Sequence, residues 1–521
     1  MSQTYDCILF TDVTYPLVIY KPLGAYRLAN HIRDHGYSCL VVDHFHTFTI
    51  DQVIDIVKKS VGTNTRFVGF SIAFFNSVQK NANTMDPTAN NTCEKLNYNQ
   101  AFCPRGAEFE IQLINEIKSI NHNCKILIGG AVRISQQISN PRVDYMITGF
   151  AESAIIAFLE NLDQGVAPSA VKNLWGIKII DGGSAEDFDF QHSIMKWLPT
   201  DVGGAKVLQL DISRGCRFNC KFCDWSMRGT KSKKWIRAVD SLVEELQTNF
   251  DHYGIYRYFI QDHTFNDSDY KINLTLEAVR ELNFQPLFWC HTRPDLLVTH
   301  PARLEKMFEI GVRSMMMGID TLNPQTAKVI GKGLNPEKII AELKNIHTRY
   351  GNELITHGNF LIGLPEETID DINKTADRLH NKEIKLHHWS YNAVMISTDT
   401  DGWWGSAFDA NPELHGYTED SDNLSFVYNV DYRKHSLMNW KNKHMNFEQA
   451  MKIAKQLSDQ ASHLVHYHED SMTTWGLMTF SDLTFDDIKH LRPSTVDWHV
   501  VSRERFRYLN QYKKTLSSAL Q

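Results

Sequence analysis

Three cysteines stand close together in the stretch SRGCRFNCKFCDWSM, which runs from residue 213 to residue 227. Their spacing is CxxxCxxC, with the aromatic Phe222 between the last two, and they are Cys216, Cys220 and Cys223. Thiolates are soft ligands, so three of them on one loop can bind a soft metal ion or an iron–sulfur cluster. The triplet therefore predicts a metal site.

Two kinds of metal site fit three cysteines. A structural zinc ion takes four ligands, usually as two close pairs of Cys or His. No second close pair follows the triplet, although His263, Cys290 and His291 are more distant donors that keep zinc open. An iron–sulfur cubane usually takes four cysteines. If only three bind it, one iron keeps an open coordination position, where a substrate or cosubstrate can bind.

The composition limits the classes of protein to which the chain can belong. It has 521 residues, of which 42% are hydrophobic and 22% charged, so we expect a globular protein with several domains. A formal charge of −7 argues against a dominant nucleic-acid-binding surface. The sequence contains no apolar run long enough to span a membrane and no signal-peptide pattern at its start, which predicts a cytoplasmic protein.

Residues 1–165 alternate between the patterns of buried strands and amphipathic helices. Strands are predicted at 4–13, 38–45, 66–74, 125–130 and 143–149, and helices at 22–36, 50–61, 107–120 and 152–162. This order predicts an α/β domain with a doubly wound, flavodoxin-like parallel sheet, and the polar stretch 76–105 is expected to be an insertion loop.

Ligands of such a sheet bind beyond the carboxyl ends of its strands. Four glycines stand at or just after those ends: Gly69, Gly129, Gly130 and Gly149. Glycine lets a backbone approach a bulky ligand closely, but it also makes ordinary turns between a strand and a helix. The spacing alone leaves both interpretations open.

The alternation stops at 166–205, where Pro, Gly, Ser and acidic residues predict a linker with a small hairpin at 174–183. It resumes over 206–398, with strands predicted at 205–213, 256–262, 286–293, 312–320, 356–364 and 387–396. Helices between them predict a partial (β/α)6 barrel, in which chemistry takes place at the carboxyl ends of the strands. The triplet directly follows the first of these strands. Residues 399–521 predict a mostly helical C-terminal cap.

With its triplet at the mouth of a partial barrel, the chain resembles the radical S-adenosylmethionine (radical SAM) superfamily. The resemblance implies a 4Fe–4S cluster held by the three cysteines, with S-adenosylmethionine chelating the fourth iron. One electron from the cluster would split this cosubstrate and yield a 5′-deoxyadenosyl radical that abstracts hydrogen from the substrate. Phe222 matches the aromatic position that the family places near adenine.

Further segments match motifs of this family in order. YFIQDHTFNDS corresponds to the segment that holds the methionine amino group, although it departs from the family's Gly-Gly-Glu form. FWCHTRPDLL supplies an arginine for a carboxylate or substrate contact, and GIDT supplies polar groups for the ribose hydroxyls. GNFLIGLPEET would pack on adenine, with Glu366 bracing the loop, and YNAVMI would give backbone hydrogen bonds. The contact residues implied are Gln261, Asp262, Arg293, Asp320, Thr321, Ile362, Gly363 and Val394.

The N-terminal region resembles the cobalamin-binding domain that precedes the barrel in many radical SAM enzymes. The segments that carry this resemblance are YKPLGAYRLANHIRDHGYSCLVVD, ILIGGAVRI and VDYMITGFAESAI. It implies a corrinoid in contact with Gly69, Gly129, Gly130 and Gly149. No DxHxxG follows the first strand, so no histidine is expected on cobalt, and His44 and His46 are interpreted as structural or solvent-exposed. A degenerate domain that has lost cobalamin is the competing interpretation.

Together the resemblances imply a cobalamin-dependent radical methyltransferase that acts on an unactivated carbon. One S-adenosylmethionine would methylate cobalamin and another would make the radical. A reducing electron donor of the flavodoxin or ferredoxin type is implied, with a small-molecule or peptide substrate that the sequence does not identify. Two alternatives stay open: a cobalamin-independent radical rearrangement or cyclisation, and a zinc-stabilised binding module without enzymatic activity.

Overall fold

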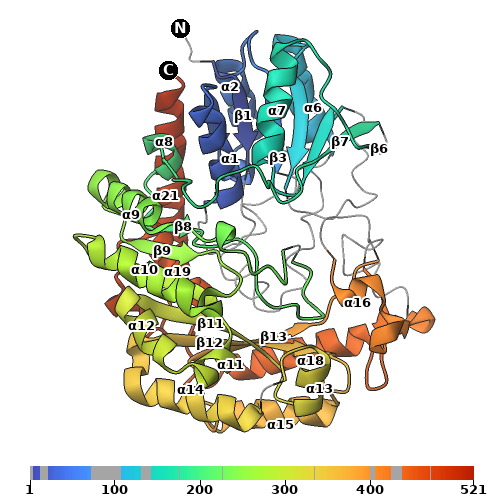
Figure 1. The fold of residues 1–521 in the computed structure, drawn as a ribbon, viewed down its shortest axis with the longest axis vertical. Helices are drawn as coiled ribbons and strands as arrows, with labels where there is room; N and C mark the ends of the chain where they lie inside the picture. The colour runs from blue at the N-terminus through green and yellow to red at the C-terminus, as the bar shows by residue number, and fades with distance from the viewer. Residues whose placement is uncertain are drawn as a thin grey trace.

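The computed structural model describes residues 4–11, 21–71, 107–130, 142–174, 176–225, 227–333, 335–398, 405–423, 437–469 and 471–521. Two β-sheets lie one above the other, and helices surround both (Figure 1). The insertion loop predicted at 76–105 lies outside the described residues. Within the described ranges, no helix is both long enough and apolar enough to cross a membrane.

The upper sheet in Figure 1 has seven strands in the order β2-β1-β3-β4-β5-β7-β6. The strands are β1 (Cys7–Phe10), β2 (Cys39–Val42), β3 (Phe67–Ser71), β4 (Lys125–Gly129), β5 (Tyr145–Thr148), β6 (Lys172–Leu174) and β7 (Ile177–Asp181). Six of them run parallel, and β6 pairs antiparallel with β7 at the edge. The central strands are buried on both faces, as expected for a sheet covered by helices on both sides. The doubly wound parallel sheet is confirmed.

Four helices cover this sheet: α1 (Leu23–Asp34), α2 (Ile50–Ser60), α6 (Ala107–Ile120) and α7 (Glu152–Asp163). The start of α2 is fixed by a capping box, in which the Thr49 side chain accepts from the Gln52 N–H and the Gln52 side chain accepts from the Thr49 N–H. The predicted hairpin at 174–183 also forms. Its second strand, β7, pairs with β5 and so extends the sheet, a pairing that the linker composition did not indicate.

The lower sheet has six parallel strands in the order β13-β12-β11-β10-β9-β8. They are β8 (Leu208–Leu210), β9 (Arg257–Ile260), β10 (Leu287–Thr292), β11 (Val312–Asp320), β12 (Ile355–Ile362) and β13 (His388–Ala393). The connecting helices are α9 (Val239–Tyr253), α10 (Asp269–Glu281), α11 (Pro294–Thr299), α12 (Ala302–Ile310), α13 (Pro324–Val329), α14 (Pro336–Tyr350) and α15 (Ile369–His380). Because β8 and β13 are edges, the sheet is an open, partial barrel, as predicted.

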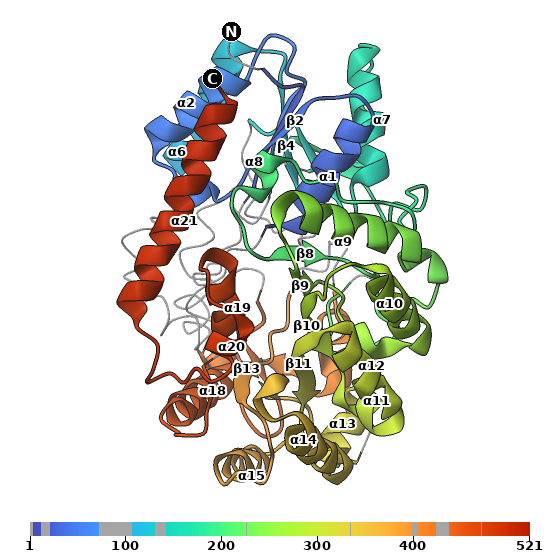
Figure 2. The same ribbon diagram turned by 90° about the vertical axis from the view of Figure 1, so that its left-hand side faces the viewer.

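Short elements and helices complete the chain after β13. They are α16 (Ala407–Ala410), β14 (Thr418–Glu419), β15 (Trp440–Lys441), α18 (Phe447–Ser462), α19 (Ser471–Phe480), α20 (Phe485–Ile488) and α21 (Trp498–Ala519). Most of this segment lies against the lower sheet, but α21 runs up to the N-terminal sheet, so the two ends of the chain lie at the same end of the molecule (Figures 1 and 2).

Buried tyrosines fasten α21 to the N-terminal sheet. The Asp43 N–H, just after β2, donates to the Tyr512 hydroxyl at 2.8 Å. The His44 ring lies between Tyr508 and Tyr512, with ring centroids 5.7 and 5.0 Å away. Gly203, at the end of α8 (Pro199–Val202), makes room for Tyr512, because a Cβ there would lie 2.6 Å from its ring. His44 is therefore structural, as the sequence indicated; the His46 side chain is not among those described.

Candidate active site

The cysteine triplet lies on the loop that follows β8, and backbone hydrogen bonds fold this loop back on itself. The Cys216 N–H donates to the carbonyl of Met227 at 3.1 Å, and the Cys223 N–H donates to the carbonyl of Cys220 at 3.1 Å. Gly215 has φ +90°, and a Cβ there would lie 2.9 Å from the Cβ of Thr230. The turn before the triplet therefore needs glycine, and the loop holds its thiols on a fixed frame.

The thiols influence one another's charge. Burial raises the pKa of Cys223 to about 11, and Cys220 and Cys216 are among the neighbours that also raise it. Burial likewise raises the pKa of Cys220, whereas Lys332 and Arg293 lower it. Among the described residues, no three His, Cys, Asp or Glu side chains converge as a single metal ion would require.

Asp262, after β9, braces the start of the triplet loop. Its carboxylate accepts from the backbone N–H groups of Ile212 and Ser213, both at 2.9 Å, and from Ser213 Oγ at 2.5 Å. The ammonium of the buried Lys271 donates to Asp262 at 3.0 Å and to the carbonyl of Thr264 at 2.8 Å. Asp262 is 2% exposed and both of its oxygens are engaged, so it holds the loop and is not placed to bind the methionine amino group as predicted.

Gln261 and His263 stand on either side of Asp262 and line the cavity between the sheets. The imidazole of His263 lies against the indole of Trp225, with ring centroids 3.9 Å apart. Burial, followed by the charges of His291 and Lys271, lowers the pKa of His263 to about 4. The ring is therefore neutral near neutral pH. Gln261 keeps the predicted position at the barrel mouth.

Arg293, after β10, reaches the triplet itself. Its Nη1 donates to Cys220 Sγ at 3.2 Å, and its Nε and Nη2 donate to the Asp295 carboxylate at 3.0 and 2.7 Å. The guanidinium carbon lies 4.0 Å from the ring centroid of Phe218. The sequence predicted a contact with a carboxylate or with substrate, so the contact with a triplet cysteine is a new feature of this residue.

Asp320 ends β11 at a bulge in its pairing with β12 and has φ +64°. It forms a buried ion pair with Lys332, whose Nζ also donates to the carbonyl of Gly318 at 2.5 Å. The same Nζ lies 6.0 Å from the ring centroid of Phe222. Lys332, which no sequence motif indicated, therefore links two residues that the family resemblance placed near the cosubstrate.

The loop after β12 is braced by Glu367. Thr321 Oγ1 donates a hydrogen bond to the buried carboxylate of Glu367, whereas Glu366 is exposed. Burial raises the pKa of Glu367 to about 8, and Asp371 and Asp320 raise it while Thr321 lowers it. The prediction that Glu366 braces this loop is wrong, because the motif could not distinguish two adjacent glutamates.

The three residues predicted to lie on the adenine side are brought together. The Val394 N–H donates to the carbonyl of Ile362 at 2.9 Å. Gly363 has φ +95°, and a Cβ there would lie 2.3 Å from the Trp440 ring. Trp440 Nε1 donates to the carbonyl of Val394 at 2.8 Å, so both backbone polar groups of Val394 already have partners. No local signal pointed to Trp440, because this contact joins distant parts of the chain.

A cavity of about 460 Å³ lies between the two sheets. The carboxyl ends of β1, β3, β4 and β5 line one side, and the residues there include Gly69, Gly129, Gly130 and Gly149. The other side is lined by residues of the barrel mouth: Ser213, Gly215, Trp225, Gln261 and His263. Gly149 makes a turn with φ +75°, as one interpretation of these glycines expects, and its contact with a ligand stays a prediction. One space thus connects the glycine-lined strand ends to the triplet loop.

Two buried ion pairs join the walls of this cavity. Arg27 of α1 pairs with Asp211 after β8, and Arg214 of the triplet loop pairs with Glu152 of α7. All four side chains are buried, and the Arg214 guanidinium also lies over the Phe150 ring at 4.4 Å. Two helices of the N-terminal sheet and the segment after β8 therefore each contribute one arginine and one carboxylate, which sets the position of one sheet against the other.

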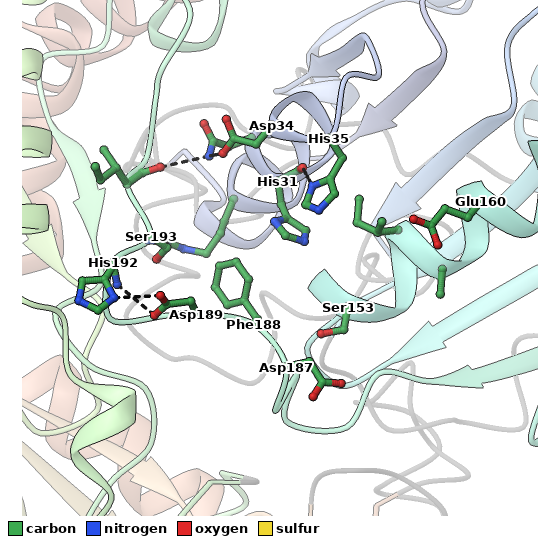
Figure 3. Close-up of a pocket in the computed structure, with 15 residues that line it drawn as sticks. His31, Asp34, His35, Ser153, Glu160, Asp187, Phe188, Asp189, His192 and Ser193 are labelled. Carbon is green, nitrogen blue, oxygen red and sulfur yellow. Dashed lines mark hydrogen bonds and ion pairs between the residues drawn. The ribbon is translucent and has the colours of Figure 1, made fainter.

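A second cavity, of about 440 Å³, shares Arg27 with the first (Figure 3). Figure 3 shows His31, Asp34 and His35 of α1 across from the segment that carries Asp189 and His192. The rings of His31 and His35 lie 4.4 Å apart, and His192 pairs with Asp189 at 2.9 Å. Among its described lining residues are none of the site residues predicted from sequence.

Residues 210–379 match the model of the Radical SAM superfamily. The matched range begins at the end of β8 and ends within α15, so it covers the triplet loop and the strands up to β12. The chain carries a radical SAM domain.

The radical SAM domain and the sheet before it are together similar to solved structures. TsrM, a radical S-adenosylmethionine methyltransferase from Kitasatospora setae solved with cobalamin and a [4Fe–4S] cluster bound, aligns over 97% of this chain and 100% of its own, with a TM-score of 0.62 and 13% identity. OxsB, a cobalamin-dependent S-adenosylmethionine radical enzyme solved with aqua-cobalamin and S-adenosylmethionine, aligns over 88% and 66%, with a TM-score of 0.56 and 14% identity. At these identities the likeness establishes the fold.

Curated relatives match parts of the chain that include this domain. An uncharacterized methyltransferase of Pyrococcus horikoshii is 25% identical over 278 residues, which are 50% of this chain and 58% of that protein. Cytidylyl-2-hydroxyethylphosphonate methyltransferase of Streptomyces wedmorensis is 30% identical over 186 residues, 33% of each chain. The matches thus span about half or less of the relatives' own lengths.

Proposed function

We propose that the protein is a cobalamin-dependent radical SAM methyltransferase that transfers a methyl group to an unactivated carbon. The observation that carries this proposal is the cavity that connects the glycine-lined strand ends of the first sheet to the triplet loop of the second. A corrinoid and a radical-generating cluster must act on one substrate, so their sites have to open onto a common space. The relatives named as methyltransferases support the same conclusion.

The triplet loop fits a 4Fe–4S cluster with one open iron. Cys216, Cys220 and Cys223 would hold it, and the cations of Lys332 and Arg293, which lower the pKa of Cys220 against its burial, favour the thiolate that a cluster binds. When bound, the cluster supplies the electron that splits S-adenosylmethionine into methionine and a 5′-deoxyadenosyl radical. A low-potential donor of the flavodoxin or ferredoxin type would deliver that electron.

The barrel mouth fits S-adenosylmethionine with a smaller set of residues than the motifs implied. Lys332 holds Asp320 in place at the end of β11, where its carboxylate would accept from ribose hydroxyls. Ile362 and Val394 supply buried apolar surface, and Phe222 and Gln261 border the mouth. These residues would bind and orient the cosubstrate, whereas Asp262 would act only by holding the triplet loop.

The strand ends of the first sheet fit a bulky corrinoid. Among the described residues, a Cβ at Gly129 would meet its nearest neighbour at an ordinary 3.6 Å, so no described contact requires glycine there, and its backbone would be open to a ligand. His44 is buried against α21 and is absent from the residues that line the cavity. Cobalamin would therefore bind without a protein histidine from this sheet on cobalt. It supplies a carrier for the methyl group.

The barrel side of the cavity would contact the substrate. The flat indole of Trp225 and the neutral imidazole of His263 face this space, and a neutral imidazole can both donate and accept a hydrogen bond. The two ion pairs, Arg27–Asp211 and Arg214–Glu152, would keep the walls at a fixed separation and limit entry of water. The substrate, a small molecule or a peptide, is not identified by these groups.

The cluster assignment is tested by replacing each triplet cysteine with Ala in the full chain. Anaerobic reconstitution of the unaltered protein should give about four irons with sulfide per chain and, under a reductant, 5′-deoxyadenosine from S-adenosylmethionine. Each variant should lose both properties, because a ligand is missing. Cys290→Ala is the control, since Cys290 is buried in β10 and should leave both properties intact. Full cleavage activity in any triplet variant would contradict the assignment.

The corrinoid assignment is tested by binding hydroxocobalamin to the full chain. We expect a complex that survives gel filtration and whose paramagnetic resonance spectrum, after reduction to cobalt(II), carries no nitrogen coupling from the protein. His44→Ala should give the same spectrum, although it lowers stability. No retained corrinoid, together with intact cleavage of S-adenosylmethionine, would favour the cobalamin-independent rearrangement or cyclisation instead.

A further inference from the structure

Arg293 makes a contact that binding of neither cosubstrate nor substrate requires. Its Nη1 donates to Cys220 Sγ at 3.2 Å, and its side chain is almost fully buried. Cys220 is also the most buried of the three triplet thiols. A permanent positive charge therefore lies against one cluster-binding sulfur, and both side chains are mostly shielded from water.

The guanidinium is held in this position from several sides. Its bidentate pair with Asp295 fixes two nitrogens, and stacking on Phe218 fixes its plane. Its backbone exchanges two hydrogen bonds with the Asn266 side chain, each 2.9 Å long. Of the three guanidinium nitrogens, the pair with Asp295 uses Nε and Nη2. Nη1 is therefore left to donate to the sulfur of Cys220.

Such a contact affects an iron–sulfur cluster through its charge. Hydrogen bonds to the sulfurs and the net charge nearby are among the factors that set a cluster's reduction potential. The reduced cluster carries one more negative charge than the oxidised cluster, so a nearby cation stabilises the reduced form. Arginine remains protonated throughout the physiological pH range, so its effect does not vary with pH.

We propose that Arg293 is a positioning residue that raises the reduction potential of the cluster through Cys220, an inference that rests on the proposed 4Fe–4S cluster. In the step concerned, a low-potential flavodoxin or ferredoxin gives one electron to the oxidised cluster. The donor is oxidised by one electron, the cluster is reduced by one, and no bond to Arg293 forms or breaks. Arg293 makes this electron transfer more favourable.

The test is a redox titration of the reconstituted full chain, followed by the paramagnetic resonance signal of the reduced cluster. In Arg293→Gln, we expect the reduced-to-oxidised ratio at a fixed potential to fall about tenfold, which is a midpoint lower by ~59 mV for one electron. Arg293→Lys keeps the charge and should recover most of the ratio.

Arg303→Gln is the matched control. Arg303 is equally buried, makes the same kind of bidentate pair, here with Asp269 at 2.8 and 3.1 Å, and donates to the backbone of Asn266. It does not contact a cysteine in the described structure. Its variant should lose stability but keep the midpoint of the unaltered protein.

A second variant should shift the midpoint potential in the opposite direction. Asp295→Asn removes the negative charge that partly offsets Arg293, so the reduced fraction at a fixed potential should rise. If Arg293→Gln binds too little iron to be titrated, the midpoint of Asp295→Asn tests the inference by itself. An Arg293→Gln protein with full iron and an unchanged midpoint, or an Asp295→Asn protein with a lower one, would overturn the inference. Absence of a cluster from the unaltered protein would instead overturn the proposed function and the inference with it.

Discussion

At the scale of single residues, Gly363 is the point where the barrel meets the C-terminal segment. Its carbonyl accepts hydrogen bonds from Tyr417 Oη at 2.8 Å and Asn442 Nδ2 at 3.1 Å. The place that a side chain would occupy is filled by Trp440, and φ is +95°. The glycine is therefore required by this packing, and its predicted contact with the cosubstrate stays a prediction.

We predict that Gly363→Ala lowers the free energy of unfolding more than a positive φ alone explains. Gly416, in the C-terminal segment, is a matched control, because it has φ +83° but no described atom within 4 Å of its Cβ position. Strain in this backbone region costs on the order of 1–3 kcal/mol, which both alanine variants should show. The additional loss in Gly363→Ala measures the clash with Trp440. Equal losses in urea denaturation would contradict this account.

Residue roles were harder to predict than residue positions. The motifs correctly located the strand ends that carry Gln261, Asp262, Arg293 and Asp320. They did not distinguish Gln261, which lines the cavity, from its neighbour Asp262, which braces the triplet loop, because one step along an extended chain reverses the direction of the side chain. They also missed Lys332 and Trp440, since each acts through a contact between segments that no local pattern encodes.

At the scale of elements, the ends of β11 and β12 are joined by polar contacts between the loops that follow them. Thr321 donates to Glu367, and Asn323 Nδ2 donates to Asp371 at 3.1 Å. Glu367 is buried and shares its surroundings with the carboxylates of Asp320 and Asp371, so its neutral form is favoured. It is therefore the protonated, neutral side chain of Glu367 that accepts the hydrogen bond from Thr321 and joins these two strand ends.

This proton predicts a pH-dependent stability. Folding raises the pKa of Glu367 from its ordinary 4.5 to about 8, so between these values the folded chain keeps a proton that the unfolded chain releases. Stability from this group is therefore full at low pH, falls as the pH rises through that window, and is lost above it. Glu367→Gln is neutral at every pH and can still accept from Thr321.

The measurement is the melting temperature of the cofactor-free protein at pH about 5 and about 8.5. We expect Glu367→Gln to melt above the unaltered protein at the higher pH and close to it at the lower one. Asp370→Asn, on the exposed face of the first turn of α15, should show no such difference. If the melting temperatures of Glu367→Gln and of the unaltered protein change with pH in parallel, protonation of Glu367 does not affect stability.

Most elements were predictable because their apolar periods are regular. The alternating strands and helices of both sheets follow the patterns read from 4–162 and 205–396. The exception is β7, in which the buried Ile177 and Ile179 flank the exposed Lys178, a pattern that a free hairpin also shows. Its pairing with β5 depends on a surface that exists only after folding, so its own sequence could not indicate it.

At the scale of the whole molecule, α21, the last helix of the C-terminal segment, links that segment to the N-terminal sheet (Figure 2). The Lys21 ammonium lies 4.6 Å from the Tyr512 ring centroid, and the Asp43 N–H donates to the hydroxyl of the same tyrosine. The two sheets are thus linked by α21 as well as by the two ion pairs.

Removing one hydroxyl group from α21 should destabilise the N-terminal sheet. In Tyr512→Phe the buried Asp43 N–H loses its acceptor, which costs about 1–3 kcal/mol. Tyr508→Phe is the control, because its hydroxyl makes a longer contact of 3.4 Å with His44 Nε2. Hydrogen exchange of the amides in β1 and β2 should speed up more in Tyr512→Phe. Equal protection in the two variants would remove α21 from the account of this sheet's stability.

The bond between Asp43 and Tyr512 also constrains how the protein is made. The two residues stand 469 positions apart in the chain. A ribosome adds about 5–20 residues per second, so Asp43 is synthesised on the order of 20–90 s before Tyr512. Throughout that time the nascent N-terminal sheet lacks α21, and until Asp211 and Arg214 are made it also lacks the partners of Arg27 and Glu152. We therefore expect it to remain a client of chaperones during translation and to become native only when α21 is complete.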